Sequence, residues 1–327
     1  MNNTLGPTSL NSLESLKNYT YTEILEQNLV SFFDWGFINA DGFSNFEISA
    51  SGPYGGDFSK LRPVDDARYS QGRVWEAVRM NWVWETGLAS SVQPISISGV
   101  FVGSTFRPIN DGSYYIDYPN GKVVFNTGIA LSSNVKVSYS SKWINVTSTE
   151  SVPWLRVGQT ASFRPDDEDF LRGSGLYQNY GETRMQFPTV AVEVVDERNQ
   201  GFQIGGGQYC RNRINFFVIA EDKNTVDRLA NIIKNQNEKT IYLYDTNKLT
   251  VDNKFPLNQF GSPNSGFLTY PSLVKYSGDG GYRYTRGVLW GKMSFDEAQV
   301  QDRQQLTSNI YQRSVTLRTE AVLTNVS

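Results

Sequence analysis

Residues 115–125 have the sequence YIDYPNGKVVF, and this stretch decides the kind of fold we expect. The β-branched and aromatic residues on both sides of Pro-Asn-Gly predict two strands joined by a tight turn. We expect a type I turn with Pro119 at its second position, Asn120 at its third, and Gly121 in the left-handed conformation of a bulge. A two-residue Asn-Gly loop is less favourable, because Pro119 would then flank the turn without an N–H for the ladder.

The length of this loop sets which residues of the hairpin face each other. A three-residue loop pairs Tyr118 with Lys122, Ile116 with Val124, and Tyr115 with Phe125. Apolar side chains then lie on much of both faces, so we expect other parts of the chain to cover each face.

The same kind of pattern extends over residues 43–146, where apolar and polar residues alternate and turn residues recur at short intervals. Such a pattern predicts an antiparallel sandwich or barrel. We expect the longest strand at 73–85 and further strands at 95–102 and 114–118. A strand at 135–139 has one polar face and is expected to lie further out.

The strand predicted at 73–85 carries Trp75, Trp82 and Trp84. Tryptophans on an otherwise apolar face are typical of a core, and this is the interpretation that we favour. The alternative is a platform on which sugar rings stack.

An amphipathic helix is predicted to begin after Thr20, because Thr20 and Glu23 have the spacing of a capping box. Gly36 offers a natural end. One face of this helix is apolar and consists of Ile24, Leu25, Leu29, Phe32 and Phe33. Either this face packs on the adjoining sheet, or Phe32, Phe33 or Trp35 docks on a neighbouring subunit.

Residues 187–327 change character and predict a ββαβ unit. We expect a hairpin at 190–204 with its turn at 196–201, a strand at 214–220, a helix from Asp222, and a strand at 241–244. The apolar face of that helix is Val226, Leu229, Ile232 and Ile233. The three glycines at 205–207 do not open a helix, so they predict a turn and not a phosphate site.

The fold class expected from these segments is mainly β with an α+β part. We divide the chain into an arm and helix at 1–40, an antiparallel β domain at 41–150, a connector at 151–186, and an α+β domain at 187–327. The last domain contains a long loop at 252–287, a candidate functional loop, and a closing strand at 311–322. The connector holds an acidic run at 166–169, which lacks the alternating ligands of a calcium loop.

Histidine is absent from all 327 residues, and Cys210 is the only cysteine. Histidine is the commonest general base and metal ligand, so its absence removes Ser-His-Asp, Cys-His and histidine-based metal mechanisms. A carboxylate pair that cleaves a glycosidic bond is the enzyme class still open, with Glu76, Glu85 and Asp57 as candidates. We expect a protein that is not an enzyme, with no catalytic residue, cofactor or metal.

The charges are mixed along the chain and sum to -3, with 30 basic and 33 acidic residues. No basic stripe of the kind that binds duplex phosphates is visible. We also expect no membrane contact, because no apolar run approaches the ~20 residues of a spanning helix. The start of the chain lacks the pattern of a secretory signal.

Four stretches of the first half resemble virion structural proteins of long-tailed bacteriophages, especially the neck and tail-completion class. They lie at 29–36, 74–85, 99–102 and 115–125. In addition, residues 187–245 are similar in layout to the small α+β fold of tail-terminator proteins.

The resemblance implies a ring of identical subunits, commonly sixfold, stacked as a connector, collar or tail terminator between head and tail. It implies adjacent neck or tail proteins as partners and passage of genomic DNA through the lumen. The implied location is the virion, assembled in the cytoplasm of the bacterial host.

Within the long loop, a cluster of Tyr and Arg has the composition of interface anchors. Its members are Tyr276, Tyr282, Arg283, Tyr284 and Arg286. An ordered surface loop is the other interpretation of the cluster. The alternative function is a baseplate or tail-fibre component that binds a host surface glycan.

Overall fold

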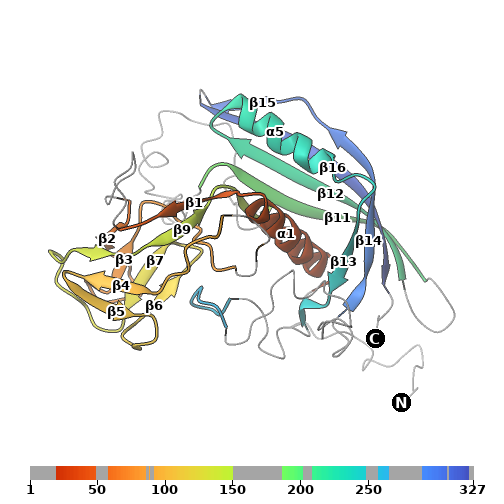
Figure 1. The fold of residues 1–327 in the computed structure, drawn as a ribbon. Helices are drawn as coiled ribbons and strands as arrows, with labels where there is room; N and C mark the ends of the chain where they lie inside the picture. The colour runs from red at the N-terminus through yellow and green to blue at the C-terminus, as the bar shows by residue number, and fades with distance from the viewer. Residues whose placement is uncertain are drawn as a thin grey trace, which may run out of the picture.

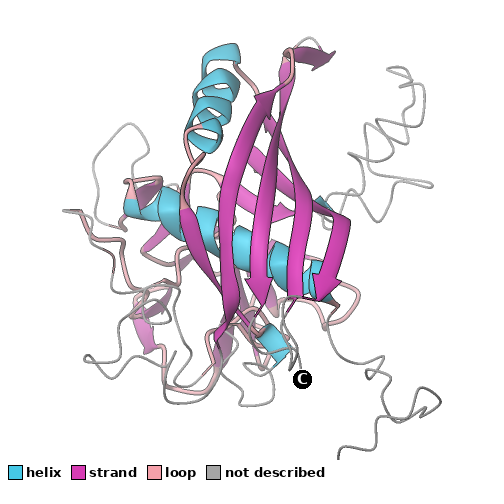
Figure 2. Ribbon diagram, turned by 90° about the vertical axis from the view of Figure 1, so that its right-hand side faces the viewer, coloured by secondary structure: helices cyan, strands magenta, loops and turns pink. Residues whose placement is uncertain are grey.

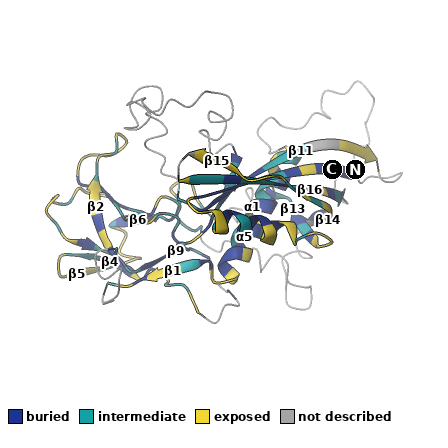
Figure 3. Ribbon diagram, turned by 90° about the horizontal axis from the view of Figure 1, so that it is seen from above, coloured by how far each residue is buried: buried dark blue, intermediate teal, exposed yellow. Residues whose placement is uncertain are grey.

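The computed structural model describes residues 20–48, 58–85, 88, 92–149, 186–201, 208–247, 257–264, 289–307 and 309–323. The described chain is mainly β, as predicted, and the helices with described bounds are α1 (Tyr21–Asn39) and α5 (Lys223–Lys234). Two sheets of seven strands and one two-stranded sheet make up the β structure of the described residues. Seen from above, the two large sheets form two lobes (Figure 3).

The first lobe, here called the short-strand sheet, has the order β5-β4-β8-β2-β3-β7-β6, with every pair antiparallel. Its strands are β2 (Lys60–Val64), β3 (Val74–Glu76), β4 (Gly99–Val102), β5 (Thr105–Pro108), β6 (Tyr114–Asp117), β7 (Lys122–Phe125) and β8 (Val135–Lys136). The two-stranded sheet lies beside it and pairs β1 (Phe43–Phe46) with β9 (Tyr139–Lys142) (Figure 1).

The long strand predicted at 73–85 is wrong, because β3 ends at Glu76 and Asn81 has a positive φ of 53°. The chain instead bends around the loop of the β6–β7 hairpin: Ala77 N–H donates to Gly121 O, and Trp82 N–H donates to Tyr118 O. This bend places both Trp75 and Trp82 in the core, with 1% and 0% of their surface exposed. The core interpretation is confirmed for these two rings, so they form no sugar platform.

The predicted register of the β6–β7 hairpin is wrong by one residue. Ile116 pairs with Val123 and Asp117 pairs with Lys122, so the loop has four residues, Tyr118–Gly121. Gly121 has the predicted positive φ, at 61°. The loop is longer because the Asp117 carboxylate accepts hydrogen bonds from the backbone N–H and the side-chain amide of Asn120, at 3.2 and 2.8 Å. A shift of one residue moves side chains to the opposite face of a strand.

The strand predicted at 135–139 is split between β8 and β9. Its position is corrected too: β8 lies between β4 and β2 rather than further out. Val135, Val137 and Tyr139 are fully buried, so their side chains fill the core of the lobe.

The second lobe, here called the long-strand sheet, has the order β10-β11-β12-β16-β14-β13, and β15 pairs with β16. Its strands are β10 (Asn145–Ser148), β11 (Thr189–Gly201), β12 (Gln208–Ala220), β13 (Thr240–Tyr244), β14 (Leu289–Val300), β15 (Gln304–Thr307) and β16 (Ile310–Leu323). The predicted ββαβ order and closing strand are confirmed. Residues 196–201 belong to β11, so the turn predicted there is wrong, and the glycines at 205–207 lie outside the described residues.

Helices α1 and α5 cover the same face of the long-strand sheet and share its core (Figure 1). The predicted start of α5 is confirmed, and Asp222 is its N-cap, because the Asp222 carboxylate accepts from Thr225 N–H at 2.8 Å. Val226, Leu229 and Ile233 are buried as predicted, whereas Ile232 is 38% exposed.

The capping box of Thr20 and Glu23 is confirmed at the start of α1. The predicted end at Gly36 is wrong, because the helix continues to Asn39. Phe37 and Ile38 are buried, and burying them outweighs the cost of about 1 kcal/mol for a glycine inside a helix. The chain leaves the helix at Asp41, which has a φ of 63°.

Helix α1 packs on both lobes. Phe33 contacts Phe216 of β12 edge to face, with ring centroids 4.9 Å apart. On another side of the helix, Trp35 and Ile38 pack with Val83. The helix therefore joins the two lobes rather than standing apart from them.

The buried Asn28 fixes α1 to the edge of the long-strand sheet. Its side chain accepts from Tyr244 N–H and donates to Tyr244 O, both at 2.9 Å. The amide thus takes the place of a neighbouring strand beside β13.

Candidate functional site

A cavity of about 340 Å³ lies on the outer face of β3, β7 and β6. Two cross-strand rows of residues form its floor. They are Val74, Val124 and Tyr115, and next to them Lys122 and Asp117. The side chains between these rows point into the core on the opposite face, since Trp75 and Val123 belong to the hydrophobic core of the lobe.

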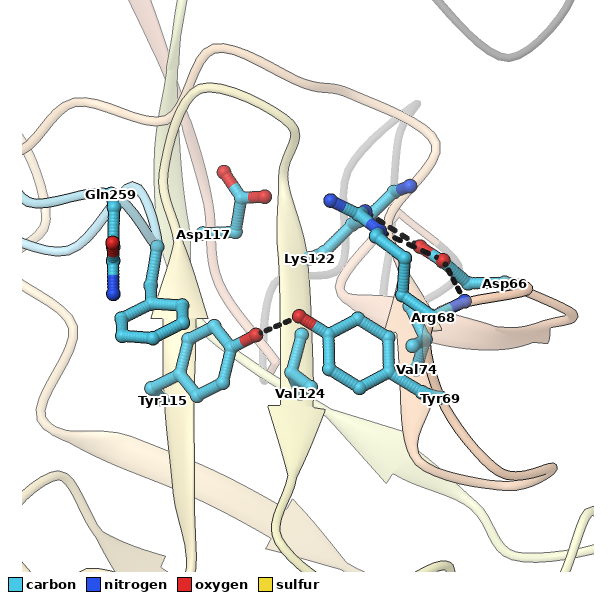
Figure 4. Close-up of a pocket in the computed structure, with 10 residues that line it drawn as sticks. Asp66, Arg68, Tyr69, Val74, Tyr115, Asp117, Lys122, Val124 and Gln259 are labelled. Atoms are coloured by element: carbon cyan, nitrogen blue, oxygen red, sulfur yellow. Dashed lines mark hydrogen bonds and ion pairs between the residues drawn. The ribbon is translucent and has the colours of Figure 1, made fainter.

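Three aromatic rings line this cavity, here called the aromatic pocket. Tyr69 comes from the loop after β2, Tyr115 from β6, and Phe260 from the segment 257–264. The hydroxyls of Tyr69 and Tyr115 point toward each other and lie 2.5 Å apart (Figure 4). The Phe260 ring is 5.2 Å from that of Tyr115 and is 47% exposed, so an apolar surface remains open to a ligand.

An ion pair between Arg68 and Asp66, which are two positions apart in the sequence, forms one rim of the aromatic pocket. Arg68 donates from Nε and a terminal nitrogen to the two carboxylate oxygens of Asp66, at 2.9 and 2.7 Å. These hydrogen bonds lower the pKa of Asp66 to about 2. The Arg68 side chain is 69% exposed, so its remaining donors face solvent.

Asp117 is the second carboxylate of the aromatic pocket. Its burial raises its pKa, although the hydrogen bonds from Asn120 act in the opposite direction. Tyr115 is affected similarly: burial, and then its hydrogen bond with Tyr69, raise the pKa of its hydroxyl. Lys122 lies directly opposite Asp117 across the hairpin.

The wall that carries Phe260 is attached by its backbone to the hairpin. Gly261 O accepts from Tyr118 N–H at 3.1 Å, and the Ser262 hydroxyl donates to Ile116 O at 2.6 Å. Gly261 has a φ of 74°, and a Cβ at this position would collide with the Asp117 carboxylate. Glycine is therefore required where the two segments meet.

The loop predicted to be functional, 252–287, contains Phe260, but the residues predicted as its anchors do not include Phe260. The hairpin face itself could have been found, since its apolar residues on both sides predicted a second cover. No local signal connects Phe260 with Tyr115, because the two residues lie far apart in the chain.

A buried ionic cluster lies where α1 meets the short-strand lobe. The Lys142 ammonium is 2.6 Å from an Asp34 carboxylate oxygen and 2.5 Å from one of Glu85. Burial raises the pKa of Glu85 to about 8, with Lys142 opposing and Asp34 adding to the rise. For Lys142, burial acts to lower the pKa, but the two carboxylates together outweigh it and raise the pKa.

The carboxylates considered for glycosidic cleavage are not brought together in the described residues. Glu85 belongs to the buried ionic cluster, Glu76 lies on β3 with a carboxylate oxygen 3.9 Å from the Lys122 ammonium, and Asp57 lies outside the described residues.

A second cavity, of about 310 Å³, lies between the lobes. Its lining includes Phe46, Lys142, Trp143, Pro188 and Asp222. Trp143 is 42% exposed.

The residues predicted as subunit anchors are placed as follows. Phe33 and Trp35 are buried inside the chain, and Phe32 is half-buried against Phe33 and Phe295. This placement favours the interpretation that the helix packs on a sheet of its own chain. Tyr276, Tyr282, Arg283, Tyr284 and Arg286 lie outside the described residues.

Within the described ranges, no group of three or more Cys, Asp and Glu side chains is placed to hold a metal ion. The helices described there include none that is both long and apolar enough to cross a membrane. Comparison of the chain with protein-family models, curated proteins and solved structures finds no match.

Proposed function

We propose that this protein is a structural subunit of a tailed-bacteriophage virion and forms a ring at the junction of head and tail. Its role there would be that of a connector, collar or tail terminator. The observation that carries the proposal is the broad outer face of the long-strand sheet.

That sheet contains four strands of 12 to 14 residues, β11, β12, β14 and β16. Helices α1 and α5 both lie on one face (Figure 2). Among the described elements, no helix covers the other face. A sheet of this length with one face that no described helix covers offers a large, rigid surface for another protein.

The outer face is mixed in chemistry, as is typical of protein interfaces. Near one end it carries the ion pairs Arg211–Glu320 at 2.8 Å and Arg318–Glu297 at 2.9 Å. In the middle, Asn215 donates to Glu193 and accepts from Thr316. At the other end, the partly exposed Phe187, Phe217 and Ile310 pack over Ala191 and Ile219, which are themselves fully buried.

A ring requires two different surfaces on each copy, because its contacts run head to tail. The second surface is offered by the short-strand lobe, where β5 is an edge strand. Phe106 on β5 and Ile109 just after it are 44% and 38% exposed. In the proposed ring, the outer face of one copy contacts this edge of the next.

The likeness of the hairpin and helix segments to phage neck proteins supports the same proposal. It suggests six copies, adjacent neck or tail proteins as partners, and DNA passing through the lumen. The virion is the proposed location.

Electron microscopy of the purified virion, together with native mass spectrometry of the isolated protein, tests the proposal. We expect a ring of about six copies, following the resemblance, near the neck. Thr316→Arg, which places a long cation in the middle of the outer face, should abolish the ring. The control Thr127→Arg, at an exposed residue of the other lobe, should leave it intact.

A chain missing from the virion would overturn the proposal, as would a chain that stays monomeric alone and with the other virion proteins. If the ring persists in Thr316→Arg, the subunits contact each other through another surface.

A further inference from the structure

We propose that the aromatic pocket binds a neutral sugar ring, a function beyond assembly. Of the tryptophans first considered for such binding, Trp75 and Trp82 lie in the core and Trp84 packs against it. The rings of Tyr69, Tyr115 and Phe260 instead form the aromatic surface that a saccharide needs.

The first argument is the combination of apolar and polar lining. A sugar ring presents C–H groups on its faces and hydroxyls around its edge, and sites for small ligands join apolar walls with a few placed polar groups. Phe260 and Tyr115 supply the aromatic wall. Asp117, Gln259 and the hydroxyl of Tyr69 lie around the same cavity (Figure 4). Its volume of about 340 Å³ suits a small ligand.

The second argument is charge. The lining has two carboxylates, Asp66 and Asp117, and two cations, Arg68 and Lys122. Their formal charges cancel, so neither an anion nor a cation gains a net attraction. A hydroxyl can donate to a carboxylate and accept from a cation, so a neutral ligand with several hydroxyls can use both kinds of group.

The third argument is the remaining hydrogen-bonding capacity of Asp117. An ionised carboxylate has about four acceptor positions, and the two bonds from Asn120 occupy two of them. The group is half-buried beside the cavity. A ligand hydroxyl can donate to a position that water would otherwise fill.

Saturation-transfer difference NMR on the full chain tests the proposal. The probes are D-glucose, D-galactose, N-acetyl-D-glucosamine and L-rhamnose, each at about 10 mM, which detects a Kd near 1 mM. We expect transfer to at least one of the four. Glucosamine and glucuronic acid, which carry opposite charges, should bind about tenfold more weakly than the corresponding neutral sugar.

Two variants and a matched control locate the site. Phe260→Ala and Asp117→Asn should each weaken binding about tenfold or more. Trp143→Ala should not, although Trp143 and Phe260 are exposed to nearly the same extent, 42% and 47%. If Asp117→Asn fails to fold, Phe260→Ala alone tests the site, because loss of an exposed ring should leave the fold intact.

Absence of transfer to all four neutral sugars would overturn the proposal, as would tightest binding of a charged sugar. Unchanged binding in Phe260→Ala would show that the sugar does not bind in the aromatic pocket. A peptide from another virion protein that binds there instead of sugars would identify the pocket as a protein contact. Ring formation should persist in Phe260→Ala, so failure of this proposal is distinct from failure of the ring.

Discussion

The two lobes are both β-rich, but different interactions hold their strands in place. Strands of the short-strand sheet have two to five residues, whereas four strands of the long-strand sheet have 12 to 14. A strand of four residues forms few ladder hydrogen bonds, so its position depends on side chains and loops. A long strand is held by a continuous ladder as well.

The two cores reflect this difference. The short-strand lobe is centred on large rings: Trp82 stacks on Tyr139 at 4.5 Å, and its indole N–H donates to Arg79 O at 2.8 Å. The long-strand lobe packs aliphatic residues of its strands against two helices, with Phe216 and Phe295 among them. A short-strand sheet thus relies on a few large anchors, and a long-strand sheet spreads its stability over many contacts.

The largest expected effect comes from removing one anchor in each core. Trp82→Ala and Phe216→Ala should each lower the free energy of unfolding by about 3–5 kcal/mol. We expect Trp82→Ala to reduce amide protection throughout the short-strand sheet and leave β12 and β16 protected. Hydrogen exchange followed by mass spectrometry measures both sheets at once.

The exposed Trp143→Ala serves as the control and should change protection little. Equal loss of protection in both sheets of Trp82→Ala would contradict the contrast between the lobes and indicate one cooperative unit.

The next effect concerns the buried ionic cluster that links α1 to the short-strand lobe. At pH 7, where Glu85 with its pKa of about 8 is mostly protonated, Lys142→Met leaves the Asp34 carboxylate without its cation, which should cost about 3–5 kcal/mol. Chemical denaturation measures this loss, and the exposed Lys60→Met is a matched control. A loss below about 1 kcal/mol would show that the cluster does not hold the lobes together.

A smaller effect is expected from pH. The pKa of Glu85 is raised from 4.5 to about 8, so the folded chain binds this proton more tightly than the unfolded chain does. The stabilisation that this proton gives to the folded chain is fully present below pH 4.5 and is lost as the pH rises through about 8. Tm should therefore fall across this window.

In Glu85→Gln the carboxyl group is replaced by an uncharged amide of similar shape, so the fall in Tm should be shallower. Differential scanning calorimetry of the two proteins over the same buffers makes the comparison, and parallel slopes would rule out Glu85 as the source.

The smallest effect belongs to the outer face of the long-strand sheet. Arg318 and Glu297 are 64% and 62% exposed, so Arg318→Ala should change the stability of the isolated chain by less than about 1 kcal/mol. Urea denaturation measures this change. A larger loss would mean that this ion pair contributes to the fold itself, and not chiefly to the surface.

Local signals in the sequence predicted the parts of the fold that local forces control. The capping box of Thr20 marked the start of α1, Asp222 marked the start of α5, and Gly121 marked the left-handed residue of the hairpin. The register was missed because a side-chain bond from Asn120 to Asp117 extends the loop. The end of α1 was missed because burial of Phe37 overrides the preference of Gly36.

The aromatic pocket, too, could be predicted only in part from local signals in the sequence. Tyr115 and Asp117 were placed on a hairpin that needed cover, but the cover itself comes from Phe260 in a distant segment. The strand β14 was also missed, although it lies inside the long-strand sheet.

The sequence by itself determined a mainly β chain with two amphipathic helices, tryptophans in a core, and no histidine for catalysis. These properties follow from periodicity, capping and composition, which act over a few neighbouring residues. Only the tertiary structure decided that α1 joins the two lobes, that one face of the long-strand sheet stays free of described helices, and that Phe260 completes the pocket. The physical reason is that such contacts depend on how distant segments bury their surfaces together, and no local pattern records this.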